Sequence, residues 1–174
     1  MQIKAARTTL TLLIALAAVS VFAETHPPVT APLRSALVRA KQVTNVPILL
    51  PSSLPALIEG DTTLVSFGDG NKDSYDISLY QSDGDGGTTI FVGDFTGDVH
   101  YKHAPNGRPV RLIDHVTGHF LPRSCGGSCA PSSIEWSVKG IHYKIQLKFG
   151  FDNERVEQET MVDAANSAIA AGAR

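Results

Sequence analysis

The two cysteines of this sequence stand close together in a glycine-rich stretch. Cys125 and Cys129 are separated by three residues, two of which are glycine. In an oxidising compartment an even number of cysteines normally pairs, and the glycines let the backbone bend enough to bring the sulfur atoms into bonding range. We therefore predict a structural disulfide. A redox-active pair usually has two intervening residues and lies beside a helix in a βαβ unit, and no such pattern surrounds these cysteines.

Two histidines precede the cysteines at a spacing that suggests a metal site. His115 and His119 followed by Cys125 and Cys129 give an H-x3-H and C-x3-C series, and both ligand types bind zinc. Gly118 and the strand-like flanks favour a hairpin, in which residues four apart do not share a face as they do on a helix. Oxidising surroundings also favour a disulfide over two thiolates. Zinc is therefore an alternative, and no metal is our main prediction.

An acidic turn gives a second, weaker metal candidate. Asp69, Asn71 and Asp73 match the opening D-x-N-x-D of a calcium-binding loop. Position six of that loop is Ser74 instead of glycine, and position twelve is Tyr80 instead of glutamate. Asp, Asn and Gly are also the residues that tight hairpin turns require. The sequence therefore favours a turn over a calcium site.

Residues for nucleophilic catalysis are present without a recognisable motif. His115 beside Asp114 could orient a base toward Ser124 or Ser128, but Ser128 is not in a G-x-S-x-G turn. We predict no catalytic residues and no cofactor. The sequence favours a protein that is not an enzyme, without deciding the question.

The clearest structural pattern is a hairpin formed by residues 134–138 and 141–149, in which apolar and polar residues alternate. Its large aromatic residues and one histidine are the candidate ligand or partner face: Trp136, His142 and Tyr143. For Trp136 a core or sheet-face position is favoured over a ligand platform, although together with Tyr143 it could line a pocket.

The N-terminus has the pattern of a cleavable export signal. Lys4 and Arg7 precede an apolar run over residues 10–22, and the small residue Ala23 follows it. This 13-residue run is shorter than the roughly 20 residues needed to span a bilayer. We expect export to the periplasm or the medium, with no integral membrane segment after cleavage.

Composition bounds what remains after cleavage. Loss of Lys4 and Arg7 changes the net charge from −2 to −4, which argues against a nucleic-acid partner. The remaining length suits one domain with a sizeable core. We predict a signal peptide over 1–23, a flexible arm over 24–32 and a single domain over 33–174.

The elements that must position these residues are strands followed by a helix. Residues 32–42 predict a short amphipathic helix, and the proline-flanked residues 46–51 predict an extended segment along an edge. Asp152 or Asn153 is a suitable N-cap for a C-terminal helix that ends near Gly172. Strands are predicted at 62–67, 75–80, 88–93, 110–114, 118–121, 134–138 and 141–149. The predicted fold is α+β, with one antiparallel sheet of about five to seven strands and the C-terminal helix on its apolar face.

The C-terminal part of the chain resembles known bacterial sequences. The pattern I-E-W-x3-G-x2-Y-x-I over 134–145, followed by an acidic helix, is similar to uncharacterised exported bacterial proteins. A similar strand pair and helix occur in a domain of unknown function in envelope and sporulation lipoproteins. The resemblance implies a small α+β envelope module and brings no catalytic residues with it.

These observations favour a non-enzymatic exported binding or envelope-associated protein, whose partner is an unknown protein or small ligand of the cell envelope. One alternative is an exported hydrolase or metal-dependent enzyme that uses His115, His119 and the Cys125–Cys129 loop. The other is an inhibitor or immunity protein for an envelope-acting toxin.

Overall fold

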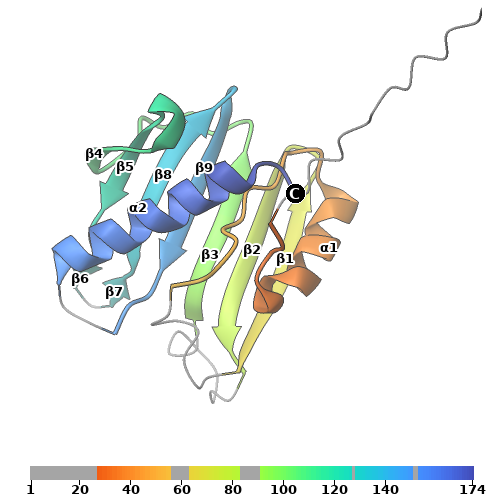
Figure 1. The fold of residues 1–174 in the computed structure, drawn as a ribbon, viewed down its shortest axis with the longest axis horizontal. Helices are drawn as coiled ribbons and strands as arrows, with labels where there is room; N and C mark the ends of the chain where they lie inside the picture. Colours follow the sequence, from red (N-terminus) through yellow and green to blue (C-terminus); the bar gives the residue numbers. More distant parts are fainter. Residues whose placement is uncertain (1–26, 56–62, 83–90, 127, 151–152) are drawn as a thin grey trace, which may run out of the picture.

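The structure, a computed structural model, describes residues 27–55, 63–82, 91–126, 128–150 and 153–174, so the predicted signal peptide lies outside it. Its centre is a seven-stranded sheet in the order β1-β2-β3-β9-β8-β5-β4, and every neighbouring pair is antiparallel (Figure 1). The α+β prediction is confirmed. The strands of this sheet are β1 (Leu64–Asn71), β2 (Ser74–Gln81), β3 (Phe91–Asp98), β4 (Arg108–Arg111), β5 (Thr117–Leu121), β8 (Ser132–Val138) and β9 (Ile141–Leu147).

The strands place a continuous apolar row on one face of the sheet. Residues paired across antiparallel strands point to the same side, and the register aligns five of them across β2, β3, β9, β8 and β5. They are Ile77, Phe95, Ile145, Ile134 and Phe120, and all are fully buried. This face, which we call the covered face, contains the core of the protein.

Two helices cover that face (Figure 1). The 3-10 turn η1 (Ala31–Leu33) leads into α1 (Arg34–Val43), which packs on β1 and β2, whereas α2 (Glu154–Ala171) packs on β8 and β9. Gly68 in β1 permits the close approach of α1, because a Cβ atom there would lie 2.1 Å from the carbonyl oxygen of Ala36.

Helix α2 begins and ends at the predicted residues. The side chain of Asn153 accepts a hydrogen bond from the Val156 N–H, and Glu154 in the first turn complements the helix dipole. Gly172 follows the last turn with φ of +70°, a conformation that favours glycine.

The predicted apolar side of α2 was wrong in part. The apolar residues Val156, Val162, Ala165, Ile169 and Ala170 recur roughly along one side of the helix and predict the side that meets the sheet, but Val156 is 39% exposed. Small residues allow the helix to approach the sheet closely, so alanines replace the larger residues at the contact. The buried residues are Glu157, Met161, Ala164, Ala165, Ala168 and Ala171.

The proline-flanked segment 46–51 lies on the covered face and not along an edge. Figure 1 shows it between α1 and α2, in front of the central strands. The Tyr75 hydroxyl accepts a hydrogen bond from the Leu49 N–H at 3.2 Å, and the Tyr143 hydroxyl donates to the Pro47 carbonyl at 3.1 Å. Side chains of the sheet therefore satisfy backbone groups that the prolines keep out of regular pairing. Its alternate residues Val46, Ile48 and Leu50 are buried.

The described part of the predicted flexible arm, residues 27–32, is also packed. Val29 is buried, and its carbonyl accepts a hydrogen bond from Arg34 Nε at 3.2 Å. The Arg174 guanidinium donates to the Pro27 carbonyl. These contacts tie the described residues of the segment to the rest of the domain.

A glycine-containing stretch that was assigned to a turn belongs to a strand, and a second glycine-containing strand is longer than predicted. Residues 68–71 complete β1, and β3 continues from the predicted strand end at Gly93 as far as Asp98. The glycines of β3 face the core, where larger neighbours use the space: a Cβ atom on Gly97 would lie 2.3 Å from the ring of Tyr75. Glycine here provides room for a partner and does not mark a turn.

The predicted hairpin around residues 115–117 has its turn at Asp114 and His115. Both have positive φ, +55° and +60°, and the Val116 N–H donates to the Ile113 carbonyl at 3.1 Å. This is the pattern of a type I′ turn, which favours Asn-Gly. The Ile113 N–H also donates to Asn166 Oδ1 of α2 at 2.9 Å, which fixes the turn to the helix.

Replacing this pair by Asn-Gly (Asp114→Asn with His115→Gly) is expected to raise the free energy of unfolding by about 1 kcal/mol. The reason is that left-handed backbone is unfavourable for most L-residues and acceptable for Gly and Asn. Urea unfolding followed by circular dichroism measures the change. His115→Ala keeps the demand for positive φ and is expected to give no gain, so equal stabilisation by both variants would contradict the turn assignment.

Candidate functional site

The face of the sheet opposite the helices carries polar side chains. Because side chains alternate along each strand, the residues between the core positions point to this side, which we call the open face. The register aligns five of them across β2, β3, β9, β8 and β5: Asp76, Thr96, Lys144, Glu135 and His119. A row of charged and polar groups therefore crosses the middle of the sheet.

One connection lies against this face and is held by a buried carboxylate. Residues 99–107, which we call the strap, lead from β3 to β4 on the far edge of the sheet. Glu135, 8% exposed, accepts a hydrogen bond from the Asn106 N–H at 2.6 Å, and the Tyr101 hydroxyl donates to its second oxygen at 3.4 Å. The strap is thus fixed to the open face through Glu135.

His142 completes this attachment. Its ring stacks on Tyr101 with centroids 3.6 Å apart and an interplanar angle of 6°. Its Nε2 lies 3.1 Å from Glu135 Oε2, at ion-pair distance but not aligned for a hydrogen bond. Burial lowers the pKa of His142, and the neighbouring Glu135 carboxylate counteracts this in part. The imidazole is therefore mainly neutral at pH 7.

A pocket opens beside the strap, with a volume of about 240 Å³. Its walls come from β1, β2, β3, β9 and the strap, so residues far apart in sequence meet there. Besides Gly70, Tyr75 and Gly97, the lining consists of Ser74, Asp76, Thr96, Asp98, Tyr101, His142 and Lys144. Two carboxylates, one ammonium and two rings in a concave site can bind a small polar molecule through charge and hydrogen bonds.

Asp94 adds a perturbed acid to the same face. It lies in the row next to the pocket, paired with Ser78 on β2 and Gln146 on β9. Burial raises the pKa of Asp94 to about 6, Lys144 counteracts the rise, and the charge of Asp76 adds to it. Its Oδ1 is buried and has no hydrogen-bond partner among the described residues. Such a group in a sheet surface is a candidate functional residue.

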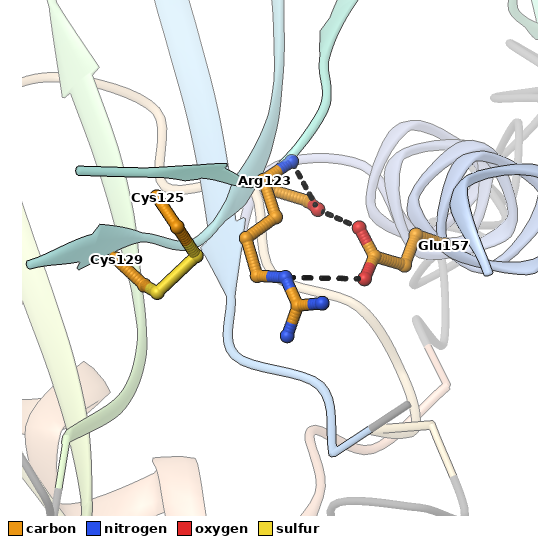
Figure 2. The surroundings of a disulfide bond; sticks show 5 residues. Arg123, Cys125, Cys129 and Glu157 are labelled. Carbon is orange, nitrogen blue, oxygen red and sulfur yellow. Dashed lines mark hydrogen bonds and ion pairs between the residues drawn. A yellow bond between two sulfur atoms is a disulfide. The ribbon is translucent and has the colours of Figure 1, made fainter. Parts of the chain in front are cut away.

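The predicted disulfide is confirmed. Cys125 and Cys129 are bonded and close a small hairpin of β6 (Ser124–Cys125) and β7 (Cys129–Ala130), in which they pair directly (Figure 2). Both cysteines are exposed. The bond therefore stabilises a surface hairpin and contributes nothing to the core.

A buried carboxylate connects the base of this hairpin to α2 (Figure 2). The Ser132 hydroxyl donates to Glu157 Oε2, and Arg123 Nε lies 4.0 Å from Glu157 Oε1. Ser132 Oγ in turn accepts a hydrogen bond from the Arg123 N–H at 3.1 Å. Glu157 is 3% exposed, so these contacts compensate for the removal of its charge from water.

Removing the disulfide with Cys125→Ser and Cys129→Ser is expected to lower the free energy of unfolding by about 2 kcal/mol. The closed loop is short, so the chain entropy that the bond removes from the unfolded state is small. Urea unfolding of the oxidised wild type and of the double variant measures the difference. Near-equal stability of reduced and oxidised wild type would contradict even this modest contribution.

The four residues of the zinc alternative do not lie together in the structure. Both sulfur atoms are in the disulfide, His115 is exposed in the β4–β5 turn, and His119 lies on the open face. No group of three or more His, Cys, Asp or Glu residues within the described ranges is arranged to hold a metal ion.

The calcium alternative falls on the β1–β2 hairpin, where its side chains bond the backbone. Asp69 Oδ1 accepts from the Gly70 N–H at 2.7 Å, and Asn71 Oδ1 accepts from the Asp73 N–H at 2.9 Å. Asp73 Oδ2 lies 3.3 Å from His100 Nε2. These oxygen atoms stabilise a turn, in agreement with the interpretation that the sequence favoured.

The predicted ligand face was wrong for two of its three residues. Trp136 and Tyr143 point to the covered face, where they are 2% and 3% exposed and stack with centroids 5.8 Å apart. His142 points to the opposite side of β9. Alternation along a strand separates adjacent residues such as His142 and Tyr143, so the three cannot form one surface.

The candidate nucleophile set is also dispersed. Asp114 and His115 precede β5, whereas Ser124 follows its other end, so these residues lie at opposite ends of an extended strand about 13 Å long. The described contact of His115 is with Arg111, whose guanidinium lies 3.5 Å from Nδ1. This arrangement gives the serine no base.

Most of the pocket residues were missed by sequence reasoning. Asp76, Asp98, Tyr101 and Lys144 have no motif in common, and neither does Asp94 in the row next to the pocket. A usable signal was the pair of aspartates within β3, because Asp is unfavourable in strands and its presence there suggests a reason other than folding.

No family model, no curated protein and no solved structure matches this chain. The site therefore has to be interpreted from its own chemistry. Across the described residues, no helix is both long and apolar enough to cross a bilayer.

Proposed function

We propose that this protein is an exported, non-enzymatic binding protein that takes a small polar ligand in the pocket beside the strap. The observation that carries the proposal is the asymmetry of the sheet. Its covered face is filled by helices, while its open face has a pocket of about 240 Å³ that gathers charged side chains from three strands. Polar groups concentrated in a pocket favour ligand recognition over core packing.

The N-terminal pattern and the disulfide support the exported part of the proposal. Lys4, Arg7 and the apolar run 10–22 have the order of a secretory signal, and exposed cysteines remain paired in oxidising compartments.

The known contacts of Glu135 and His142 support binding over catalysis. Both are used to hold the strap: Glu135 accepts from Asn106 and Tyr101, and His142 stacks on Tyr101. A pair engaged in this way positions the wall of a pocket.

The test is a ligand screen read at single residues. Small cations, anions, zwitterions and neutral sugars are titrated into the oxidised protein without its signal peptide while amide and side-chain NMR signals are recorded. We expect at least one class to shift the signals of Asp76, Thr96 and Lys144 in a saturable manner. A screen in which every saturable shift falls outside the pocket, or in which none occurs, would overturn the proposal.

A further inference from the structure

The charges around the pocket are unequal, and this inequality selects the ligand. Lys144 is the cation of the lining, and two carboxylates outside the lining already act on it. Glu135 is its direct cross-strand partner, and the charge of Asp94 interacts with it from β3. The positive charge of Lys144 is therefore offset before a ligand arrives.

The two carboxylates of the lining lack such compensation. Asp76 and Asp98 form no ion pair with a lysine or arginine within the described ranges. Asp76 Oδ1 accepts a hydrogen bond from Ser78 Oγ at 2.9 Å, and Asp98 Oδ1 accepts from the His100 N–H at 2.6 Å. Each carboxylate is thereby oriented, and its second oxygen accepts no hydrogen bond from a described residue.

The neutral ring of His142 leaves this imbalance in place. Among the lining residues and their direct cross-strand partners, the charged groups are Asp69, Asp76, Asp98 and Glu135 against Lys144, and Asp94 lies in the next row. A cation is the occupant that such a field attracts. The pocket volume of about 240 Å³ lies below the range typical of drug-sized ligands, so the occupant is small.

We propose that the pocket binds a small aliphatic amine, with its ammonium group between the carboxylates of Asp76 and Asp98 beside the Tyr101–His142 stack. This inference rests on the proposed function and specifies its ligand class. An ammonium group has three N–H donors, which match the two open carboxylate oxygens and a hydroxyl such as that of Thr96.

Amine binding is also expected to change the protonation of Asp94. A bound cation near Asp76 favours the ionised form of the neighbouring acid, so amine binding is expected to lower the pKa of Asp94 from about 6. By linkage, amine affinity is expected to fall as the pH is lowered through 6, because protonation of Asp94 removes negative charge from the site.

The experiment uses three probes of matched size: n-butylamine, n-butanol and butyrate. They are titrated at pH 7.5 into the oxidised protein without its signal peptide, and binding is read from the NMR signals of Asp76, Asp98 and Tyr101. We expect saturable binding of n-butylamine only. Lys144→Gln removes a repulsive charge and is expected to strengthen amine binding several-fold.

Variants separate a specific site from general attraction. The double variant Asp76→Asn with Asp98→Asn is expected to weaken amine binding at least tenfold. Asp163 is exposed on the outer side of α2, and Asp163→Asn is expected to leave amine binding unchanged. Unchanged unfolding temperatures confirm that the variants are folded. Equal losses in both variants would overturn the amine site.

The two proposals fail in different ways. Saturable binding of butanol or butyrate in the pocket, without butylamine, would overturn the amine inference and leave the proposed binding function standing. Absence of butylamine binding in the pocket overturns the inference, and absence of any pocket ligand in the wider screen overturns both.

Discussion

Trp136→Ala is expected to lower the free energy of unfolding by about 3–5 kcal/mol, because it removes a large aromatic side chain from the core. Trp136 is 2% exposed and stacks on Tyr143, whose hydroxyl bonds the Pro47 carbonyl. The cavity would therefore lie where the sheet meets the segment between the helices. Urea unfolding followed by fluorescence of tyrosine and by circular dichroism measures the loss.

Trp136→Phe is the matched control for this prediction. The indole Nε1 is buried and has no hydrogen-bond partner in the described part of the chain, so phenylalanine removes volume without leaving a polar group unpaired. We expect a loss of about 1 kcal/mol. A loss below about 1 kcal/mol for Trp136→Ala would instead fit an exposed interaction residue and would contradict the core placement.

Asp94→Asn is expected to raise the free energy of unfolding by about 2 kcal/mol at pH 7.5 and by nothing at pH 3. In the folded protein burial raises the pKa of Asp94 to about 6, from 3.8 in an unperturbed carboxyl. Each unit of this rise corresponds to about 1.4 kcal/mol, so the ionised carboxylate lowers the free energy of unfolding by at most about 3 kcal/mol. The exposed part of the carboxylate reduces this figure.

The sign follows from proton binding. Below pH 4 the carboxyl is protonated in both folded and unfolded states, so the stability of the neutral form is fully present. As the pH rises toward 6, the unfolded chain releases the proton first, and the wild-type protein loses this stability. The amide that Asp94→Asn introduces has no proton to lose, so the advantage of the variant develops between pH 4 and pH 6 and stays constant above.

Asp163→Asn serves as the control, because Asp163 is exposed on α2. It is expected to change stability by less than about 0.5 kcal/mol at every pH. Chemical denaturation from pH 3 to pH 8 gives both curves. If the difference in free energy of unfolding between the wild type and Asp94→Asn did not change with pH, the raised pKa would be contradicted.

Asp94 differs from the core residues of the sheet, because its carboxylate destabilises the fold at neutral pH. The covered face is apolar throughout its central row, whereas Asp94 stands beside Asp76, whose charge raises its pKa further. Proteins retain such destabilising groups where a function needs them. A gain in stability together with weaker amine binding in Asp94→Asn would connect both predictions at one site.

Much of the fold was predictable because its signals are local. The β8–β9 hairpin follows from strict alternation on either side of Lys139-Gly140, and α2 follows from the Asn153 cap and Gly172. The disulfide follows from two nearby cysteines in a flexible stretch. Each of these features depends on residues within a few positions of one another.

The glycines of β1 and β3 show where local signals were misleading. Gly68 and Gly97 lie within strands because Ala36 and Tyr75 occupy the space where their side chains would be. The same residue type is favourable in a turn, and only the packed neighbour distinguishes the two uses.

By itself the sequence determined that His142 and Lys144 share one side of β9 and that Tyr143 and Ile145 share the other, because a strand alternates with a period of two. Only the tertiary structure decided which strands stand next to β9 and where the strap crosses the open face. The pocket depends on those decisions, since Asp76, Asp98, Tyr101 and Lys144 come from four segments joined through strand order and the strap. Contacts between distant segments are set by the packing of the whole core, and no short stretch of sequence encodes them.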